Sequence, residues 1–207
     1  MKGAWLFLDI GNVLFAVDHD RSRRQFSSLT RLDPGEFDWI FFDSGLVDLF
    51  NKGLISEEGF LHRVRGDVRH HGAHLDDEQI RDVWDAMLVP VAGIEAWLRE
   101  LEPAVEGVWI LSDINPFHWR AARDFLARVP LSKLKGATLS FELGVTKPAA
   151  AFYEDALGRS GARPDRVIFV DDRSINLQGA RKLGIEGVLF DRLDRARDQV
   201  ARRLKGR

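Results

Sequence analysis

Residues 5–14 read Trp5-Leu6-Phe7-Leu8-Asp9-Ile10-Gly11-Asn12-Val13-Leu14, an apolar run that ends at an aspartate and resumes after a glycine and an asparagine. A short apolar run bounded by turn residues is typical of a buried strand in a parallel sheet. We expect this strand to end at Asp9, and in open α/β sheets ligands bind at the carboxyl ends of the strands. The stretch therefore places a carboxylate where chemistry commonly takes place, although an aspartate at such a point also commonly caps a turn or a helix.

Four further apolar runs have the same character, and helical patterns separate them. We expect strands at residues 107–111, 137–141, 166–170 and 187–190. Strands that alternate with helices indicate a parallel sheet with right-handed crossovers. The predicted fold class is therefore α/β, a doubly wound parallel sheet with a Rossmann-like core.

A helical segment interrupts this pattern directly after the first strand. Between residues 18 and 91 the sequence shows helix signals and no convincing strand. The signals are N-terminal caps, namely Asp33 before Pro34, Ser56 before Glu57 and Glu58, and Asp76 with Gln79 in the spacing of a capping box. We expect residues 17–91 to form a small helical-bundle cap, and residues 1–16 and 92–207 to form the catalytic core.

The composition excludes several classes of protein. The chain of 207 residues is 45% hydrophobic and 30% charged, which suits one domain with an insert. Its 30 Lys and Arg against 32 Asp and Glu give a net charge of −2, without the basic bias of a nucleic-acid-binding surface. It has no cysteine for disulfides or thiolate chemistry, and no apolar stretch that would span a membrane. Since its start lacks a signal-peptide pattern, we expect a soluble cytoplasmic monomer or homodimer with no nucleic-acid or membrane partner.

Polar groups follow the predicted strands at one edge of the sheet. They are Asp9, Ser112, Lys147, Asp171 and Asp172. Each has an ordinary alternative as a cap, a turn residue or a solvated charge. Together they are more informative, because adjacent carboxylates repel unless a cation lies between them, and their oxygens suit Mg²⁺. Carboxylates, a divalent cation, a hydroxyl and an ammonium group are what phosphoryl transfer needs, and a carboxylate can itself be the nucleophile.

In four ordered motifs the chain resembles the haloacid dehalogenase-like hydrolase superfamily. The motifs are residues 7–14, 110–112, 144–148 and 170–180, which read FLDIGNVL, ILS, GVTKP and VDDRSINLQGA. Each is weak alone, but the ordered set is specific. The helical insert is similar to the C1-type cap of that superfamily. The resemblance covers the whole chain and implies a cap that closes over the substrate and opens for release.

The resemblance implies a metal site with Mg²⁺ as the cofactor. Asp9 would be both the nucleophile and a metal ligand, and the backbone carbonyl of Gly11 would be a second ligand. Asp172 would bind the metal directly. Asp171 would support it or bind it through water, and Asn176 would order this loop.

The resemblance also implies a phosphoryl-binding set. Ser112 would bond a phosphoryl oxygen, and Lys147 would bridge that oxygen and the nucleophile. Relatives usually have asparagine where this chain has Asp113, and that amide helps to bind the phosphoryl group. We place Asp113 among the substrate-binding positions, where a carboxylate would repel a phosphate dianion unless it is protonated or turned away.

A second departure concerns the proton that the leaving group needs. Phosphatases of the superfamily usually carry a second aspartate, the general acid and base, at the position of Gly11. Without it an alkoxide leaves unprotonated, at a cost of ~10²–10⁴-fold in rate. One resolution is an acidic leaving group such as the anomeric oxygen of a sugar 1-phosphate, since the Asp-Ile-Gly-Asn-Val pattern resembles bacterial glucose-1-phosphate phosphatases, which also have glycine there. The other is a proton from Asp18, His19 or Asp20 at the predicted hinge, where a solvated hinge is the ordinary alternative.

We therefore expect a Mg²⁺-dependent phosphatase that hydrolyses a small phosphorylated metabolite, such as a sugar phosphate, through an aspartyl-phosphate intermediate. A metal-independent carbon–halogen hydrolase is a second hypothesis, because it also lacks the second aspartate, but retention of the acidic pair Asp171-Asp172 counts against it. A catalytically weak binding or regulatory protein is a third. Gly11 and Asp113 favour that hypothesis, and the retained nucleophile, serine, lysine and metal ligands count against it.

Overall fold

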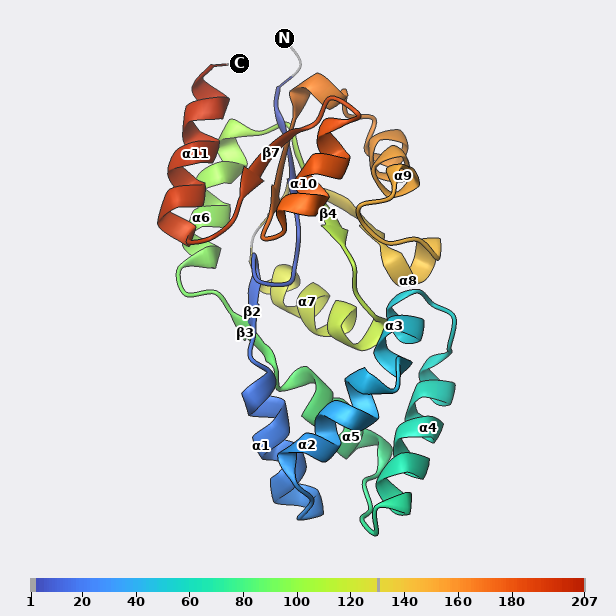
Figure 1. Ribbon diagram of the computed structural model, residues 1–207. Helices are drawn as coiled ribbons and strands as arrows, with labels where there is room; N and C mark the ends of the chain where they lie inside the picture. The colour runs from blue at the N-terminus through green and yellow to red at the C-terminus, as the bar shows by residue number, and fades with distance from the viewer. Residues whose placement is uncertain (1–2, 130, 207) are drawn as a thin grey trace.

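The computed structural model describes residues 3–129 and 131–206 and contains an α/β core and a helical part (Figure 1). Both ends of the described chain lie in the core, and the helical part lies beyond the carboxyl ends of the central strands. Within the described ranges, no helix has the length and apolar character needed to cross a bilayer.

The core is built on a five-stranded parallel sheet with the strand order β5-β4-β1-β6-β7. Its strands are β1 (Trp5–Leu8), β4 (Gly107–Ser112), β5 (Leu134–Leu139), β6 (Val167–Asp171) and β7 (Glu186–Leu189). The chain adds strands on one side of β1 and then on the other, which confirms the predicted doubly wound fold. The change of direction occurs beside β1, so a ligand crevice is expected at the carboxyl end of that strand.

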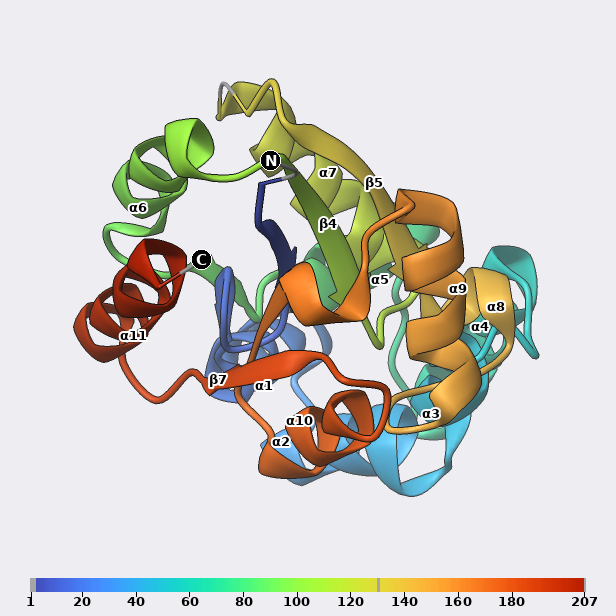
Figure 2. The same ribbon diagram turned by 90° about the horizontal axis from the view of Figure 1, so that it is seen from above.

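Side chains that alternate along the central strands form two buried layers, one on each face of the sheet. In β1, Leu6 and Leu8 lie in one layer and Phe7 lies in the other. The first face is covered by α6 (Ile94–Leu101), α7 (Pro116–Arg128) and α11 (Leu193–Lys205), and the second by α9 (Ala150–Ser160) and α10 (Ser174–Arg181) (Figure 2). Short 3₁₀ turns occupy Glu102–Ala104 and Pro164–Arg166. Because both faces are covered, the central strands are apolar throughout rather than alternating with polar residues.

The helical part has a hydrophobic cluster of its own. Its elements are α1 (His19–Thr30), α2 (Pro34–Asp38), a π-helical turn (Trp39–Asp43), α3 (Leu46–Asn51), α4 (Glu57–His70) and α5 (Asp77–Asp85). The predicted caps are confirmed, since Asp33, Ser56 and Asp76 accept hydrogen bonds from the first turns of α2, α4 and α5. Buried aromatic rings fill the space between these helices, with Phe41 and Trp84 stacked 5.2 Å apart.

Two short strands connect the core and the helical part. β2 (Phe15–Val17) and β3 (Leu88–Pro90) pair antiparallel where the chain leaves the core and returns to it. The prediction of no strand between residues 18 and 91 is therefore wrong for β3. Three residues are too few to show an alternating pattern, and the partner strand lies at the other end of the insert, so the pairing has no local signal.

The predicted third strand of the core is displaced. β5 ends at Leu139, and the next residues form the short helix α8 (Ser140–Leu143) rather than more strand. The Ser140 hydroxyl accepts a hydrogen bond from the Ile114 N–H at 2.9 Å and donates to the Asn51 carbonyl oxygen at 2.5 Å. These side-chain bonds to backbone groups replace strand pairing at this point.

Candidate active site

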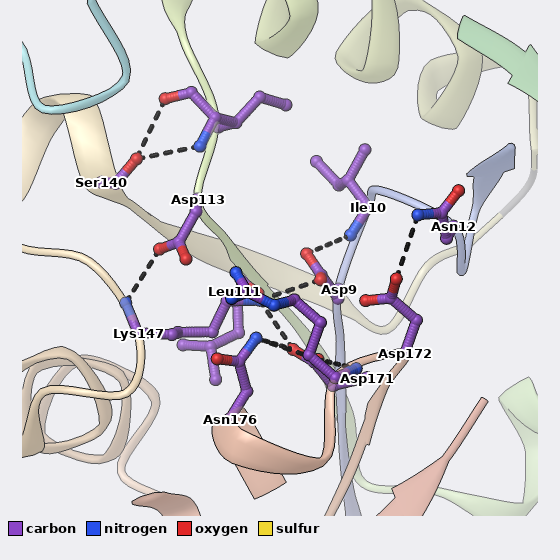
Figure 3. Close-up of polar contacts among 12 residues, drawn as sticks. Asp9, Ile10, Asn12, Leu111, Asp113, Ser140, Lys147, Asp171, Asp172 and Asn176 are labelled. Atoms are coloured by element: carbon purple, nitrogen blue, oxygen red, sulfur yellow. Dashed lines mark hydrogen bonds and ion pairs between the residues drawn. The ribbon is translucent and has the colours of Figure 1, made fainter. Parts of the chain in front are cut away.

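The loops after β1, β4, α8 and β6 enclose a polar pocket of about 160 Å³ (Figure 3). Its lining residues are Asp9, Gly11, Asn12, Asp113, Lys147, Asp172, Arg173 and Asn176. All of them belong to the core. A larger hollow of about 670 Å³ between α7 and β5 is mainly apolar and contains none of the predicted site residues.

The ammonium group of Lys147 joins two of the predicted carboxylates. Its side chain is 1% exposed, and Nζ lies 2.9 Å from Asp9 Oδ2 and 2.8 Å from Asp171 Oδ2. Nζ also donates to the carbonyl oxygen of Leu111 at 3.0 Å. Three acceptors match the three protons of an ammonium group, which is the condition for keeping such a charge buried. Lys147 therefore fixes the positions of both carboxylates.

Burial and neighbouring charges together shift the pKa values of Asp9 and Lys147. Burial raises the pKa of Asp9 to about 7, since desolvation outweighs the attraction of Lys147, and Asp171 acts in the same direction as burial. For Lys147, burial by itself lowers the pKa, but Asp9, Asp171 and Asp113 together raise it above its ordinary value. The lysine thus remains charged, and a further cation in the pocket would favour the ionised form of Asp9.

The two consecutive aspartates after β6 have different surroundings. Asp171 is fully buried, and it accepts hydrogen bonds from the Arg173 N–H at 2.8 Å and the Asn176 amide at 3.0 Å in addition to the lysine. Asp172 lines the pocket and accepts from the Asn12 amide at 3.0 Å. Asp171 is thus held by protein donors, whereas Asp172 presents its carboxylate to the pocket.

The acidic residues of the pocket fit a divalent cation. Carboxylate oxygens of Asp9, Asp171 and Asp172 lie within 4.8 Å of one another. Oxygen donors of this kind are the ligands that Mg²⁺ prefers. Asp9 and Asp172 line the pocket and Asp171 lies behind them, so Asp9 and Asp172 are better placed as direct ligands. Gly11 lies in the pocket wall with them.

Of the two residues that follow Leu111, only Asp113 reaches the pocket wall. Ser112 is the last residue of β4 and is 1% exposed, so its phosphoryl-binding role stays a prediction. Asp113 Oδ1 accepts from the backbone N–H of Lys147 at 2.9 Å (Figure 3). Burial raises the pKa of Asp113, and the charge of Lys147 opposes this effect. One oxygen of Asp113 is therefore turned toward the lysine loop.

The three polar residues at the hinge have partners away from the pocket. Asp18 caps α1. The His19 ring packs edge-on against Phe42, with the ring centroids 5.0 Å apart. Asp20 forms an ion pair with Arg23. None of the three lines the pocket, so their contacts favour a structural role at the hinge over proton donation.

Two residues of the pocket were absent from the predicted site. Asn12 adopts the left-handed backbone conformation with φ 54°, and its side chain bridges Asp172 and the Val17 N–H, the latter at 3.1 Å. An asparagine directly after a glycine was a usable signal, since asparagine tolerates this conformation and bonds locally. Arg173 also lines the pocket. Its position after two aspartates gave no signal, because an arginine in a loop is commonly a solvated charge.

Comparisons with known proteins identify the family and the fold. A family model described as haloacid dehalogenase-like hydrolase matches residues 15–184. D-ribitol-5-phosphate phosphatase from Bacteroides thetaiotaomicron is 28% identical over 196 residues, which cover 87% of this chain and 88% of that protein. Two solved structures have the same fold. One is a HAD family enzyme from Bacteroides thetaiotaomicron in complex with magnesium and inorganic phosphate, with a TM-score of 0.75 and 24% identity over 90% of this chain and 93% of that chain. The other is a HAD-like family hydrolase from Porphyromonas gingivalis, with a TM-score of 0.80 and 23% identity over 99% of both chains.

Proposed function

Because the chain belongs to the haloacid dehalogenase-like hydrolase family, we propose that it is a Mg²⁺-dependent phosphatase of small phosphate esters. The observation that carries the proposal is the buried Lys147, whose ammonium group joins Asp9 and Asp171 at the edge of a pocket that Asp172 also lines. A held carboxylate, a fixed cation and further carboxylate oxygens for a metal are the parts that phosphoryl transfer uses.

In the first step Asp9 is the nucleophile. One carboxylate oxygen attacks phosphorus and forms a P–O bond, while the bond to the leaving oxygen breaks and its electron pair stays with that oxygen. The Ile10 N–H at 2.7 Å and Lys147 Nζ at 2.9 Å hold the two oxygens of Asp9, so the carboxylate is oriented before the ester binds. In this mechanism Ser112 bonds a non-bridging oxygen of the phosphoryl group. Lys147, whose three protons go to Asp9, Asp171 and the Leu111 carbonyl oxygen, attracts the phosphoryl group through its charge.

In the second step water hydrolyses the aspartyl phosphate. The water oxygen attacks phosphorus, the P–O bond to Asp9 breaks, and the carboxylate is regenerated. One proton of the water stays on inorganic phosphate, and the other passes through solvent to the alkoxide released in the first step. Since Gly11 supplies no acid for the alkoxide, esters with acidic leaving groups should react faster.

The proposed cofactor is Mg²⁺, held by Asp9, Asp172 and the backbone carbonyl of Gly11. When bound, the ion would neutralise charge that develops on the phosphoryl oxygens. Asp171 supports this site without needing to bind the ion directly, because Asn176 and Lys147 already hold it.

The proposed substrate class is a phosphorylated sugar or polyol. The pocket of about 160 Å³ has room for a phosphoryl group and is lined by polar side chains, so the organic part of the ester would extend toward the helical part. A relative that is 28% identical is named for the hydrolysis of D-ribitol 5-phosphate, which supports this class.

We also propose that residues 17–91 form a cap domain over a core of residues 1–16 and 92–207, whose residues 1–2, 130 and 207 lie outside the described structure. The separate hydrophobic cluster of the helical part supports this division. We place the protein in the cytoplasm as a monomer or homodimer, with no nucleic acid or membrane among its partners.

The test is phosphate release from an activated aryl phosphate, sugar 1-phosphates, sugar 6-phosphates, ribitol 5-phosphate and nucleotides, with Mg²⁺ and with chelator. We expect turnover that the chelator abolishes and that Asp172→Asn reduces, while Asp198→Asn on the exposed face of α11 leaves it unchanged. Turnover that survives the chelator would refute the metal assignment. No release from any ester would refute the phosphatase and leave the dehalogenase and binding hypotheses.

A further inference from the structure

The loop between β4 and α7 is held by contacts on two sides. On the core side, Asp113 accepts from the backbone N–H of Lys147 at 2.9 Å. On the other side, its last residues meet the helical part through Asn51, the final residue of α3. The predicted phosphoryl-binding Ser112, the last residue of β4, directly precedes the loop. Whatever fixes its far end therefore bears on the geometry of the pocket.

Asn115 is the residue through which the helical part contacts this loop. It is 1% exposed, and its side-chain amide donates to Asn51 Oδ1 at 3.1 Å. Its Oδ1 accepts from the His118 N–H at 3.1 Å and lies 3.4 Å from the indole nitrogen of Trp84. Asn51 and Trp84 belong to the helical part. Asn115 is the N-cap residue of α7, and His118 lies in the first turn of that helix. The buried amide is thus shared between the two parts.

His118 fixes the orientation of that amide. Its Nε2 lies 3.1 Å from the Trp84 carbonyl oxygen, which can only accept, so Nε2 carries the proton. Its Nδ1 is then an acceptor and faces the Asn115 amide nitrogen at 3.5 Å. The imidazole and indole rings stack with centroids 4.9 Å apart and planes 4° from parallel. The Asn115 amide nitrogen is therefore the donor and Asn51 Oδ1 is the acceptor.

A second bond from Asn51 reaches the same loop by another route. The Asn51 carbonyl oxygen accepts from the Ser140 hydroxyl at 2.5 Å, and this hydroxyl accepts from the Ile114 N–H at 2.9 Å. Asn51 thus contacts Ile114 through Ser140, and Asn115 directly. These are the two residues that follow Asp113.

We propose that Asn51 is a positioning residue, through which docking of the helical part sets the geometry of the loop that carries Ser112 and Asp113. The proposal rests on the proposed phosphatase function. Among the described residues, no hydrogen bond joins Asn51 to a residue that lines the pocket, so its effect passes through Asn115 and Ile114. A loop displaced by even a fraction of an ångström would misalign the phosphoryl group with Asp9.

The test compares Asn51→Ala with Asn51→Asp and with Glu57→Gln. Aspartate keeps an oxygen that accepts from Asn115, whereas alanine removes it. Glu57 pairs with Arg120 across the same boundary at 2.8 Å. Within the described ranges it forms no hydrogen bond to the loop and does not line the pocket, so it controls for weakened docking in general. Each variant is measured for kcat and KM with an aryl phosphate and Mg²⁺, and for binding of inorganic phosphate by calorimetry.

We expect Asn51→Ala to lower kcat and weaken phosphate binding by about tenfold each, with Asn51→Asp within about threefold of the parent and Glu57→Gln unchanged. A structural role alone would lower the melting temperature of Asn51→Ala without changing kcat well below that temperature, and this result would overturn the proposal. If the parent hydrolyses no ester, the proposed function fails. Phosphate binding then decides, since equal affinities in the parent and Asn51→Ala would refute the positioning role, and weaker binding in Asn51→Ala would support it.

Discussion

Lys147 is surrounded by carboxylates that depend on it for a counter-charge. Removing its ammonium group would leave Asp9 and Asp171 buried without a partner cation, and breaking a buried pair in this way costs about 3–5 kcal/mol. In the proposed mechanism the same lysine also attracts the phosphoryl group. Stability and catalysis therefore depend on one side chain in this pocket, and a variant of Lys147 would not separate the two.

The variant Asp9→Asn separates the effect on catalysis from the effect on stability more cleanly. An amide of the same size cannot form the aspartyl phosphate, so we expect phosphate release to fall by more than ~10³-fold. Burial raises the pKa of Asp9 to about 7, so desolvation disfavours its charged form, and Lys147 keeps Asp171 as a partner in this variant. The melting temperature of this variant should stay within a few degrees of the parent's. Residual turnover near the parent's rate would contradict the nucleophile assignment.

Asp113→Asn tests the negative charge beside the lysine loop. Asparagine keeps an oxygen that can accept from the Lys147 N–H, but it removes the repulsion between the carboxylate and a phosphate dianion. We expect KM for an aryl phosphate to fall by about 3- to 10-fold. Steady-state kinetics at fixed Mg²⁺ would measure the change, and a higher KM would mean that the carboxylate assists binding.

At this scale the acidic residues of the pocket and Lys147 could be predicted from the sequence, because each follows a buried strand or precedes a helix. Asn12 and Arg173 could not be singled out in that way. The contribution of Asn12 depends on a left-handed backbone at one position and on contact with Asp172 far along the chain. Neither the conformation nor the distant partner is visible in a strand pattern.

The turn after α3 brings the helical part close to the backbone of α8. Gly53 has φ 65°, and a Cβ atom added there would lie 2.1 Å from the Phe141 carbonyl oxygen. Gly45 has a similar φ of 72°, but a Cβ atom there would meet nothing within 4 Å. An alanine at either position would have a similar left-handed backbone. Only at Gly53 would its Cβ atom also meet a neighbouring chain segment.

Gly53→Ala should therefore destabilise the protein more than Gly45→Ala. We expect about 1 kcal/mol for Gly45→Ala from the left-handed backbone alone, and about 3 kcal/mol for Gly53→Ala because the turn must also move away from α8. Urea unfolding of the two variants measures both values. Equal losses would show that the turn can leave Phe141 without cost.

Elements marked by local sequence features such as helix caps could be predicted. Elements that depend on contacts between distant parts of the chain could not. Asp33, Ser56 and Asp76 marked three helix starts correctly because capping is local chemistry. The strands β2 and β3 pair across the whole insert, and the end of β5 depends on Ser140 bonding to Ile114 and Asn51. These features come from tertiary contacts, which override local preference.

The helical part and the core meet along α7. Phe117 of that core helix is 1% exposed and belongs to the hydrophobic cluster of the helical part, where it lies 5.0 Å from the ring of Phe50. His118 on the next position stacks on Trp84. Since these contacts join residues from distant parts of the chain, the sequence predicted the two parts but not the surface through which they dock.

The buried His118 makes the stability of the whole molecule depend on pH. Burial lowers its pKa from 6.5 to about 4. Between these values the unfolded chain binds more protons than the folded chain, so this residue makes stability rise with pH across that window. Its contribution to the free energy of unfolding should fall by about 2 kcal/mol between pH 7 and pH 5.

The measurement compares urea unfolding of the parent and His118→Gln at pH 5 and pH 7. The raised pKa of Asp85, about 6 because of burial, acts in the opposite direction but is present in both proteins. We expect the stability difference between parent and variant to shift by about 2 kcal/mol in favour of the variant at pH 5. A difference that is independent of pH would contradict a neutral buried His118.

The pairing of β2 with β3 has a consequence for how such proteins diversify. The insert begins and ends at one two-stranded ribbon. The insert can therefore be replaced, lengthened or shortened without a change in the strand order of the core sheet. The replacement has to match the start of α7, where Asn115 and Phe117 lie, and the backbone of α8 that Gly53 approaches. New substrate preferences can then arise by exchange of the insert as a unit, while the inherited carboxylates and lysine beneath it remain unchanged.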